Sequence, residues 1–327
     1  MSNSRPGYGR LSAVLLAALF LSLACSGAWA QAYPNRPVRV IVPFPPGGTL
    51  DIVARLLVQR LAEQTAQPFV LENRPGGNGT IGAAAVAKAN ADGYTLQFSA
   101  STFATSDLVM AHPPYRVPSD FTPIALVARA PLSVSINKQL PITDMAGLFG
   151  YARAHPGELS FAIGSAGSAG HLATELLKRS GGGTYLIVPY KGSAPAYQDL
   201  IGGAIAGFVD PVLGAIQYHK AGALRILAVT SAARLPTLPD IPTVSETLPG
   251  YEFTSWYALW GPARLPGDIV QRLNEEVNKA LSSGLREKLL AQGLLSEGGS
   301  AAEFARFQQA YIAQSATLIR DANIHVE

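Results

Sequence analysis

The sequence predicts an α/β fold in two lobes, and two observations carry this prediction. Runs of β-branched residues alternate with segments whose apolar residues recur at helical spacing, a pattern typical of a sheet covered by helices. Glycine-rich turns join a strand to a helix in both halves of the chain. Two such halves suggest a cleft between them, with the chain crossing from one to the other near residues 128–131 and 253–256.

The first 30 residues predict a secretory signal peptide. Two arginines precede an apolar run from residue 11 to residue 25, and Ala28-Trp29-Ala30 provides a small-x-small cleavage site. We therefore expect a periplasmic protein, exported by the general secretory route and cleaved after Ala30. The apolar run is shorter than the roughly 20 residues of a membrane span. The residues before Cys25 make a poor lipobox, so a membrane anchor and lipidation at Cys25 are the less favoured alternatives.

In the first half, the residue pattern predicts strands alternating with helices. Leu50, Val53, Ala54, Leu57 and Leu61 share one helical face directly after a β-branched run and a Pro/Gly cluster. This alternation is typical of a parallel sheet. The expected strands are 38–42, 68–72 and 94–99, and the expected helices are 50–61 and 81–89.

The second half repeats this order and ends in helices. Ser300 and Glu303 form a capping box ahead of an apolar helical stripe. The Pro-rich residues 235–249 predict an irregular connection. The expected strands are 159–163, 185–188 and 225–230, and the expected helices are 172–177, 191–203, 269–281 and 300–311.

Composition restricts the function. Signal-peptide removal takes away two of the 25 basic residues, none of the 22 acidic residues and the only cysteine, leaving a nearly neutral chain. Without a strong positive field, we expect no nucleic-acid partner. Without a thiol, catalytic cysteines and thiolate metal sites are excluded. The five histidines lack metal-ligand spacing to carboxylates, so we expect no metal and no cofactor.

Two of the glycine-rich turns predict an anion site. Residues 44–51 and 165–171 each expose backbone N–H groups ahead of a helix, whose dipole adds a partial positive charge. Facing each other across a cleft, they could hold a carboxylate or phosphate without a basic side chain. Ser168 is expected to cap its helix. His171 either donates to a ligand or only starts that helix, and the sequence leaves both interpretations open.

Two catalytic or cofactor motifs match in part. Gly77, Gly79 and Gly82 fit the dinucleotide fingerprint, but the acidic residue expected about 20 residues later is missing. Ser168, Asp210 and His219 follow the triad order of α/β-hydrolases, although only nine residues separate Asp210 from His219. An exported serine hydrolase using these three residues is the alternative function.

A longer series of motifs resembles the Bug family, the periplasmic solute-binding proteins of tripartite tricarboxylate transporters. Residues 43–55 read PFPPGGTLDIVAR, similar to the family signature PF-x-PGG-x-x-D-x-x-AR. The similarity covers nearly all of the mature chain, in order. It continues through residues 72–82, 91–96, 120–124, 188–192, 228–231 and 238–244.

The resemblance implies a two-lobed periplasmic-binding-protein fold of the Venus-flytrap type II class. Each lobe is expected to be a mixed sheet flanked by helices, and crossing strands join the lobes. Lobe one would take 31–130 plus 254–327, and lobe two 131–253. The implied function is capture of a small carboxylate, organic, aromatic or amino acid, by a monomeric non-enzyme. The implied partner is a tripartite tricarboxylate-type permease or a sensor.

The resemblance also implies ligand-binding positions in both lobes. Asp51 is expected to order the glycine loop rather than touch ligand, and a buried Asp210 would select an amine or ring N–H. The segments 98–103 and 202–208 depart from the family pattern, and both are expected near the specificity side of the pocket. The implied positions are Phe44, Gly47, Gly48, Asp51, Asn78, Gly79, Ser101 and Thr102 in lobe one, and Ser165, Ala166, Ser168, His171 and Asp210 in lobe two.

Overall fold

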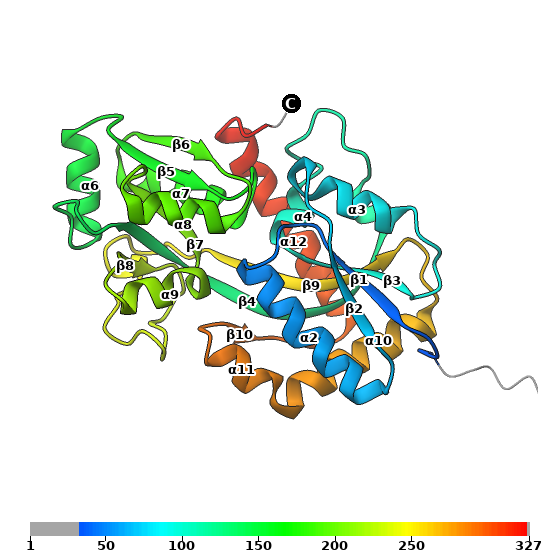
Figure 1. The fold of residues 1–327 in the computed structure, drawn as a ribbon. Coiled ribbons are helices and arrows are strands. Elements are labelled where there is room, and N and C mark those ends of the chain that lie inside the picture. The colour runs from blue at the N-terminus through cyan, green and yellow to red at the C-terminus, as the bar shows by residue number, and fades with distance from the viewer. Residues whose placement is uncertain (1–32, 326–327) are drawn as a thin grey trace, which may run out of the picture. The chain divides into compact units, whose positions relative to one another are not determined.

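The computed structural model describes residues 33–325, of which residues from Arg36 onward form one compact unit (Figure 1). The predicted signal peptide, its cleavage site and Cys25 lie outside the described residues. Within the described range, no helix combines the length and the apolar character needed to cross a membrane.

The chain up to its longest strand, β4, alternates strands with helices. β1 has the bounds expected from its β-branched run, and α2 buries Leu50, Val53, Ala54 and Leu57 on one face. The elements are β1 (Val38–Val42), α2 (Thr49–Thr65), β2 (Phe69–Asn73), η2 (Gly77–Gly79), α3 (Thr80–Ala87), β3 (Thr95–Ala100), α4 (Ser101–Thr105), α5 (Val117–Asp120) and β4 (Phe121–Asn137).

After β4 the alternation resumes, and the chain ends in helices. The predicted capping box is present at the start of α12, where Ser300 and Glu303 exchange hydrogen bonds with each other's backbone N–H. The elements are α6 (Met145–Ala154), β5 (Leu159–Ile163), α7 (Ala169–Gly181), β6 (Tyr185–Pro189), α8 (Ser193–Gly202), β7 (Gly207–Pro211), α9 (Val212–Lys220), β8 (Leu224–Val229), η3 (Val244–Glu246), β9 (Thr254–Pro262), α10 (Gly267–Ala280), η4 (Leu281–Leu285), α11 (Arg286–Leu290), β10 (Leu295–Ser296) and α12 (Ala301–Asp321).

The strands form one curled, mixed sheet in the order β2-β1-β3-β9-β4-β7-β5-β6, with β10 and β8 also paired to β4. β4 pairs with β9 from Phe121 to Pro131, and from Leu132 onward it pairs with β7 and β8. β4 therefore belongs to two parts of the sheet, which we call the first sheet (β2, β1, β3, β9, β10) and the second sheet (β7, β8, β5, β6). Figure 1 shows β4 and β9 running side by side.

The parallel pairing expected from the strand–helix alternation is present within each lobe, and the whole sheet is mixed, as the family resemblance implies. β1, β2 and β3 are parallel, as are β5, β6 and β7. β9 runs antiparallel to β3, and β4 runs antiparallel to β9, β7 and β8. The antiparallel pairs arise because β4 and β9 carry the chain across the sheet instead of returning through a helix.

Separate apolar clusters pack on the two sheets. On the first sheet, the fully buried Trp256 and Trp260 pack edge-on against Phe304 of α12. On the second sheet, Phe161 stacks on Tyr185. The two-lobed fold therefore has a core in each lobe, and the strand-to-helix turns of both lobes lie where the sheet parts meet.

Candidate functional site

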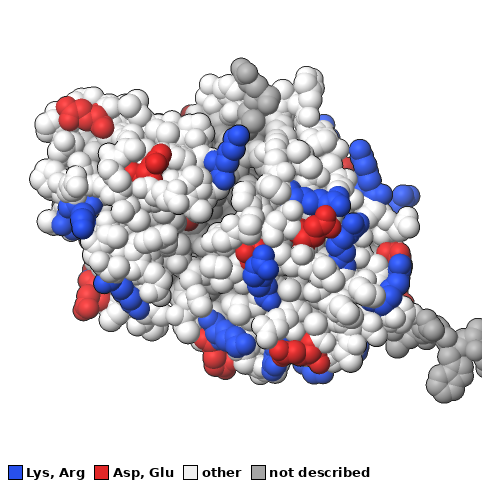
Figure 2. Space-filling view, in the orientation of Figure 1, with Lys and Arg blue, Asp and Glu red and all other residues white. Residues whose placement is uncertain are grey.

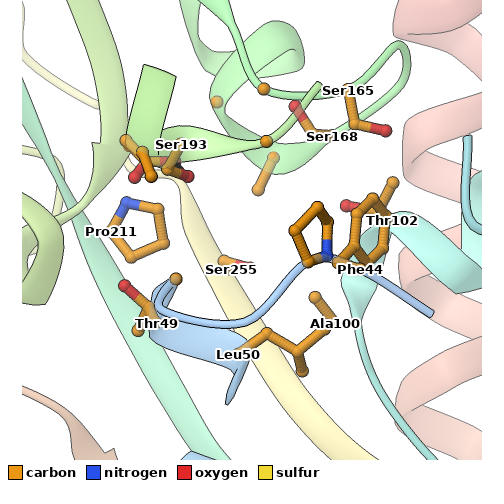
Figure 3. Close-up of a pocket in the computed structure, with 18 of the residues that line it drawn as sticks. Phe44, Thr49, Leu50, Ala100, Thr102, Ser165, Ser168, Ser193, Pro211 and Ser255 are labelled. Carbon is orange, nitrogen blue, oxygen red and sulfur yellow. Dashed lines mark hydrogen bonds between the residues drawn. The ribbon is translucent and has the colours of Figure 1, made fainter. Parts of the chain in front are cut away.

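A cavity walled by both lobes is the candidate site. It spans about 780 Å³ of space between the atoms of its walls, and part of this space is open to solvent. Figure 3 shows Ser165 and Ser168 across the cavity from Thr49 and Leu50. The lining residues are Phe44, Pro45, Pro46, Gly48, Thr49, Leu50, Ala100, Thr102, Gly164, Ser165, Ser168, Ala169, Gly170, Lys191, Gly192, Ser193, Ala194, Pro195, Asp210, Pro211, Ser255 and Tyr257.

The N-termini of α2, α7, α8 and α9 converge on this cavity. Their N-cap residues, Gly48, Ser168, Gly192 and Pro211, all line it. Gly48, Gly192 and Pro211 make no side-chain capping bond, so first-turn N–H groups of α2, α8 and α9 remain available to a ligand. Four positive helix ends favour an anion between them.

The first glycine loop is tied to its helix by Asp51. The buried carboxylate accepts hydrogen bonds from Gly47 N–H (3.1 Å), Asn73 Nδ2 (3.0 Å) and Arg55 Nε (2.9 Å). Burial by itself would raise the pKa of Asp51, but the hydrogen bonds from Arg55, Asn73 and Gly47 lower it overall. Asp51 does not line the cavity, and its bond to Gly47 is the contact through which it orders the loop.

The turn before α7 is held by its own side chains. Ser168 Oγ accepts from His171 N–H at 3.2 Å, which confirms Ser168 as the N-cap. His171 Nδ1 accepts from Gly167 N–H at 3.2 Å. Burial lowers the pKa of His171 to about 4, so the ring is neutral at pH 7. His171 does not line the cavity, and the geometry supports its structural interpretation.

Among residues 33–325, Asp210 is the only acidic residue that lines the cavity, and Lys191 is the only basic one. Asp210 is 8% exposed, and its Oδ1 accepts from Ser193 Oγ at 3.1 Å. Its Oδ2 has no hydrogen-bond partner among the described residues. Burial raises the pKa of Asp210 to about 7, although the Ser193 and Tyr197 hydroxyls lower it. Burial therefore favours the protonated form of this carboxyl group more than it would at the surface.

Two loops from different lobes are bonded beside the cavity. Asn78 Nδ2 donates to Ala166 O at 3.1 Å, and Asn78 Oδ1 accepts from Ser165 Oγ. Thr105 Oγ1 donates to Gly167 O at 2.9 Å, in a buried position. These bonds join the two lobes directly. Asn78 also lines a second cavity, which shares Phe44, Pro45, Gly164, Lys191 and Gly192 with the first.

Eight of the thirteen predicted site residues line one of the two cavities, and the other five line neither. Phe44, Gly48, Thr102, Ser165, Ser168 and Asp210 line the main cavity. Asn78 and Gly79 line the second cavity. Gly47, Asp51, Ser101, Ala166 and His171 line neither.

The structure also adds residues that the sequence reasoning missed. Ser193 follows the motif at 188–192, and its position at the start of a helix was a usable signal. Ser255 and Tyr257 come from β9, far along the chain from the glycine turns, and no local pattern marks them.

The structure places two further groups of predicted residues away from the cavity wall. The segment 202–208 does not line either cavity, because the cavity meets β7 at its opposite end, at Asp210 and Pro211. His219 lies near the end of α9, and its Nδ1 accepts from Ile226 N–H at 3.2 Å. His219 therefore does not join Ser168 and Asp210 at the cavity. Asp210 instead pairs with Ser193.

Among the described residues, neither a large patch of one charge nor a cluster of metal-ligating side chains marks the surroundings of the cavity. Figure 2 shows Lys, Arg, Asp and Glu scattered over this face without a large patch of one sign. Within residues 33–325, no three His, Cys, Asp or Glu side chains are grouped to hold a metal ion. The positive features at the cavity are therefore the four helix ends and the exposed Lys191.

Comparisons with known proteins agree with this geometry. A family model described as "Tripartite tricarboxylate transporter family receptor" matches residues 53–324. Protein BugT of Bordetella pertussis is 38% identical over 287 residues, covering 85% of this chain and 88% of BugT.

Among solved structures, "R. palustris Rpa4515 with adipate" has a TM-score of 0.87 and 40% identity, covering 90% of this chain and 99% of that one. MatC from Rhodopseudomonas palustris, with bound malate, has a TM-score of 0.82 and 31% identity, covering 88% of this chain and all of MatC (100%).

Proposed function

Because this chain belongs to the tripartite tricarboxylate transporter receptor family, which includes the Bug proteins, we propose that it is a periplasmic binding protein for a small carboxylate. In this proposal the protein captures its ligand between the lobes and acts by binding, not by catalysis. The observation that carries the proposal is the convergence of four helix N-termini on one cavity.

The chemistry of the cavity supports an anionic ligand. Backbone N–H groups at helix starts can hold an anion without the desolvation penalty of burying a cationic side chain. Thr49, Thr102, Ser168 and Ser255 add hydroxyl groups that can orient carboxylate oxygens. The related structures carry adipate and malate. Aliphatic dicarboxylates are therefore the first ligands to test.

The proposed mechanism is closure of one lobe on the other. The lobes are proposed to comprise residues 31–130 plus 254–327 and residues 131–253. A ligand that contacts both lobes binds the closed form better and shifts the population toward it. The bonds of Asn78 to the 165–166 loop would form only in that closed form. A tripartite tricarboxylate-type permease, or a sensor, would then read the closed surface of the monomer.

A thermal-shift screen of the purified protein tests the proposed function. The panel contains adipate, malate, tricarboxylates, aromatic acids and amino acids, with glucose as a neutral control. A ligand at 100 times its dissociation constant stabilises the folded protein by about 2.7 kcal/mol, which raises the melting temperature by several degrees. A screen in which no carboxylate raises the melting temperature contradicts the proposal.

The proposed export route has its own test. Expression of the full chain in a bacterium with a periplasm should yield a mature protein that begins at Gln31, released by osmotic shock. Intact mass determination reads the cleavage site directly. Recovery of the full-length chain from the cytoplasm, or cleavage at a different residue, would contradict export with cleavage after Ala30.

A further inference from the structure

The unpartnered carboxyl oxygen of Asp210 is the one feature of the cavity that an anion-binding function leaves unexplained. Asp210 is more than nine-tenths buried and lines the cavity, and in the part of the chain that the structure describes its Oδ2 has no hydrogen-bond partner. A buried, unpaired, ionised carboxylate is costly. It is more costly still in a cavity that is built to receive a second negative charge.

The groups that face Asp210 do not supply a counter-charge. From α8, Ser193 donates to Oδ1, and the Tyr197 hydroxyl lies near the carboxyl group without hydrogen-bond geometry. From β9, Tyr257 is near enough for the Asp210 charge to raise its pKa. From β4, Ser133 Oγ donates to the backbone carbonyl of Asp210 at 3.3 Å.

The charged side chains near the cavity do not act on the Asp210 carboxyl group. On α7, the charges that act on His171 are Glu175 and Lys178. Lys191, at the cavity wall, is exposed. Among the described residues, no charged group contributes to the shift of the Asp210 pKa, which is raised by burial and lowered only by hydroxyl groups.

The helix ends place a ligand carboxylate next to this acid. Asp210 directly precedes Pro211, the N-cap of α9, and it bonds to Ser193, the first residue of α8. An anion held by these two helix starts would lie close to the Asp210 carboxyl group. Two carboxylate oxygens can approach each other only if a proton lies between them.

We propose that Asp210 binds the ligand in its protonated form and donates its proton in a hydrogen bond to a ligand carboxylate, so that ligand capture takes up a proton. This inference rests on the proposed function, because it needs a carboxylate ligand. It makes Asp210 a specificity residue for carboxylates and against ammonium groups. The expectation that Asp210 selects an amine or ring N–H is the competing outcome.

The direction of the pH effect follows from this arrangement. In the free protein, burial raises the pKa of Asp210 to about 7, and an anion bound beside it would raise this pKa further. Affinity should therefore fall as the pH rises above about 7, by about tenfold per pH unit for one coupled proton. Aliphatic carboxylates stay fully ionised in this range, so their own titration does not contribute.

Isothermal titration calorimetry with adipate as the probe tests the proposal on the purified wild-type protein. Titrations at about pH 6.5, 7.5 and 8.5, each in two buffers of different ionisation enthalpy, give the affinity and the number of protons taken up. We expect proton uptake that approaches one at the highest pH and a dissociation constant that rises at least fivefold from 7.5 to 8.5. If another carboxylate from the thermal-shift screen binds better, the same titration uses that compound.

Two variants assign the proton to Asp210. Asp210→Asn keeps a neutral donor beside an oxygen that can still accept from Ser193, so its affinity for adipate should no longer change between pH 6.5 and 8.5, and its binding should take up no proton. Asp144→Asn makes the same charge change at the exposed N-cap of α6 and should behave as wild type. Tyr197→Phe should keep the pH dependence of adipate binding. That result would show that the nearby hydroxyl is not the titrating group.

The outcomes separate the inference from the function. If no carboxylate binds, the proposed function fails. Binding of adipate without proton uptake, with an affinity that is flat or rises with pH, overturns the protonated Asp210. An Asp210→Asn variant that keeps its wild-type melting temperature but loses adipate binding also overturns it, because the ionised acceptor would then be the required form.

Discussion

At the scale of single residues, the cavity is built by side chains that never reach it. Asp51 accepts from Gly47 N–H and is bonded to Asn73 and Arg55, while the cavity wall in front of it is Gly48 and Thr49. The loop can thus present backbone N–H groups to a ligand because an acid behind it satisfies the neighbouring donors. Substitution of such a residue is therefore expected to change the free energy of unfolding.

Replacement of Asp51 by Ala should lower the free energy of unfolding by about 2 kcal/mol, since it leaves Gly47 N–H and Asn73 without their acceptor. Urea denaturation at pH 7 measures the change. The exposed Asp268, in the first turn of α10, is the matched control, and Asp268→Ala should stay within about 0.5 kcal/mol of wild type. Equal effects of the two substitutions would remove the structural role given to Asp51.

The Asp51 contribution has a defined pH dependence. The pKa of Asp51 is lowered in the folded protein, so its stabilising effect is complete above the unfolded-state pKa. It is lost as the pH falls through the lowered folded-state value. The stability difference between wild type and Asp51→Ala should therefore shrink in strong acid.

His171 should destabilise the protein in mild acid. Its pKa is lowered by burial to about 4, from an ordinary value of 6.5. Below pH 6.5 the unfolded chain binds a proton at this histidine, while the folded chain does not bind it until the pH reaches about 4. The free energy of unfolding should therefore fall between pH 6.5 and 4, by about 3 kcal/mol in total. Urea denaturation over this range should show a smaller loss in His171→Asn than in wild type.

A second histidine provides the control for this acid effect. His155 is exposed on the surface after α6. His155 pairs with Glu158 and stacks on Tyr151, so His155→Asn reports the effect of removing a surface histidine. If His171→Asn loses as much stability in acid as the wild type does, the imidazole of His171 is not responsible for the acid loss.

At the scale of elements, the start of α7 can pack closely against β7 because Gly170 has no side chain. A Cβ on Gly170 would lie 2.1 Å from the carbonyl oxygen of Val209 in β7. The helix can therefore approach the strand that carries Asp210 only with glycine at this position. The close approach brings Ser168 and Asp210 into one cavity.

Gly170→Ala should destabilise the protein by about 1–3 kcal/mol, because α7 must move away from β7, and it should weaken carboxylate binding as well. The control is Gly150→Ala in the interior of α6, where an added Cβ meets no atom within 4 Å. That change should stabilise the protein by about 0.5–1 kcal/mol. Chemical denaturation of both variants checks the opposite signs.

Elements were predictable from the sequence where local chemistry decides them. β1 and β5 have the bounds that their apolar runs indicate, and the cap at Ser168 follows from its residue type. β7 was not predicted, because Gly207, Asp210 and Pro211 give it the composition of a turn. It becomes a strand because β4 and β5 lie on either side of it.

The same distinction holds for the site. Phe44, Gly48 and Ser168 lie on glycine-rich turns with a recognisable local pattern. Tyr257 and Ser255 line the same cavity from β9, and only the pairing of β9 with β3 and β4 brings them there. Local pattern therefore predicts the turns that hold an anion, while the floor of the cavity depends on the tertiary fold.

At the scale of the whole molecule, Asn78 links the lobes through a loop in the left-handed conformation. Its φ is +54°, and its side chain bonds to both Ser165 and Ala166. Asn78→Gly keeps the backbone conformation and removes both bonds. If these bonds form on closure, the dissociation constant for a carboxylate ligand should rise by about 5- to 30-fold, which corresponds to about 1–2 kcal/mol.

Calorimetric titration with adipate measures this effect, and small-angle scattering reports whether the ligand-bound variant is less compact. Asn323→Gly is the control, because Asn323 has a similar φ of +50° in an exposed position after α12. It should bind as wild type does. An unchanged affinity in Asn78→Gly would show that the two loops contribute nothing to closure.

The strand β4 also constrains how such a protein can change over evolutionary time. Its residues before Leu132 are paired with one set of strands and those after it with another, so a single segment of the gene serves both cores. A recombination event that exchanged one lobe between two relatives would have to join two foreign half-strands within β4. New ligand preferences should therefore arise mostly by substitution in the turns around the cavity, while the two lobes are inherited together.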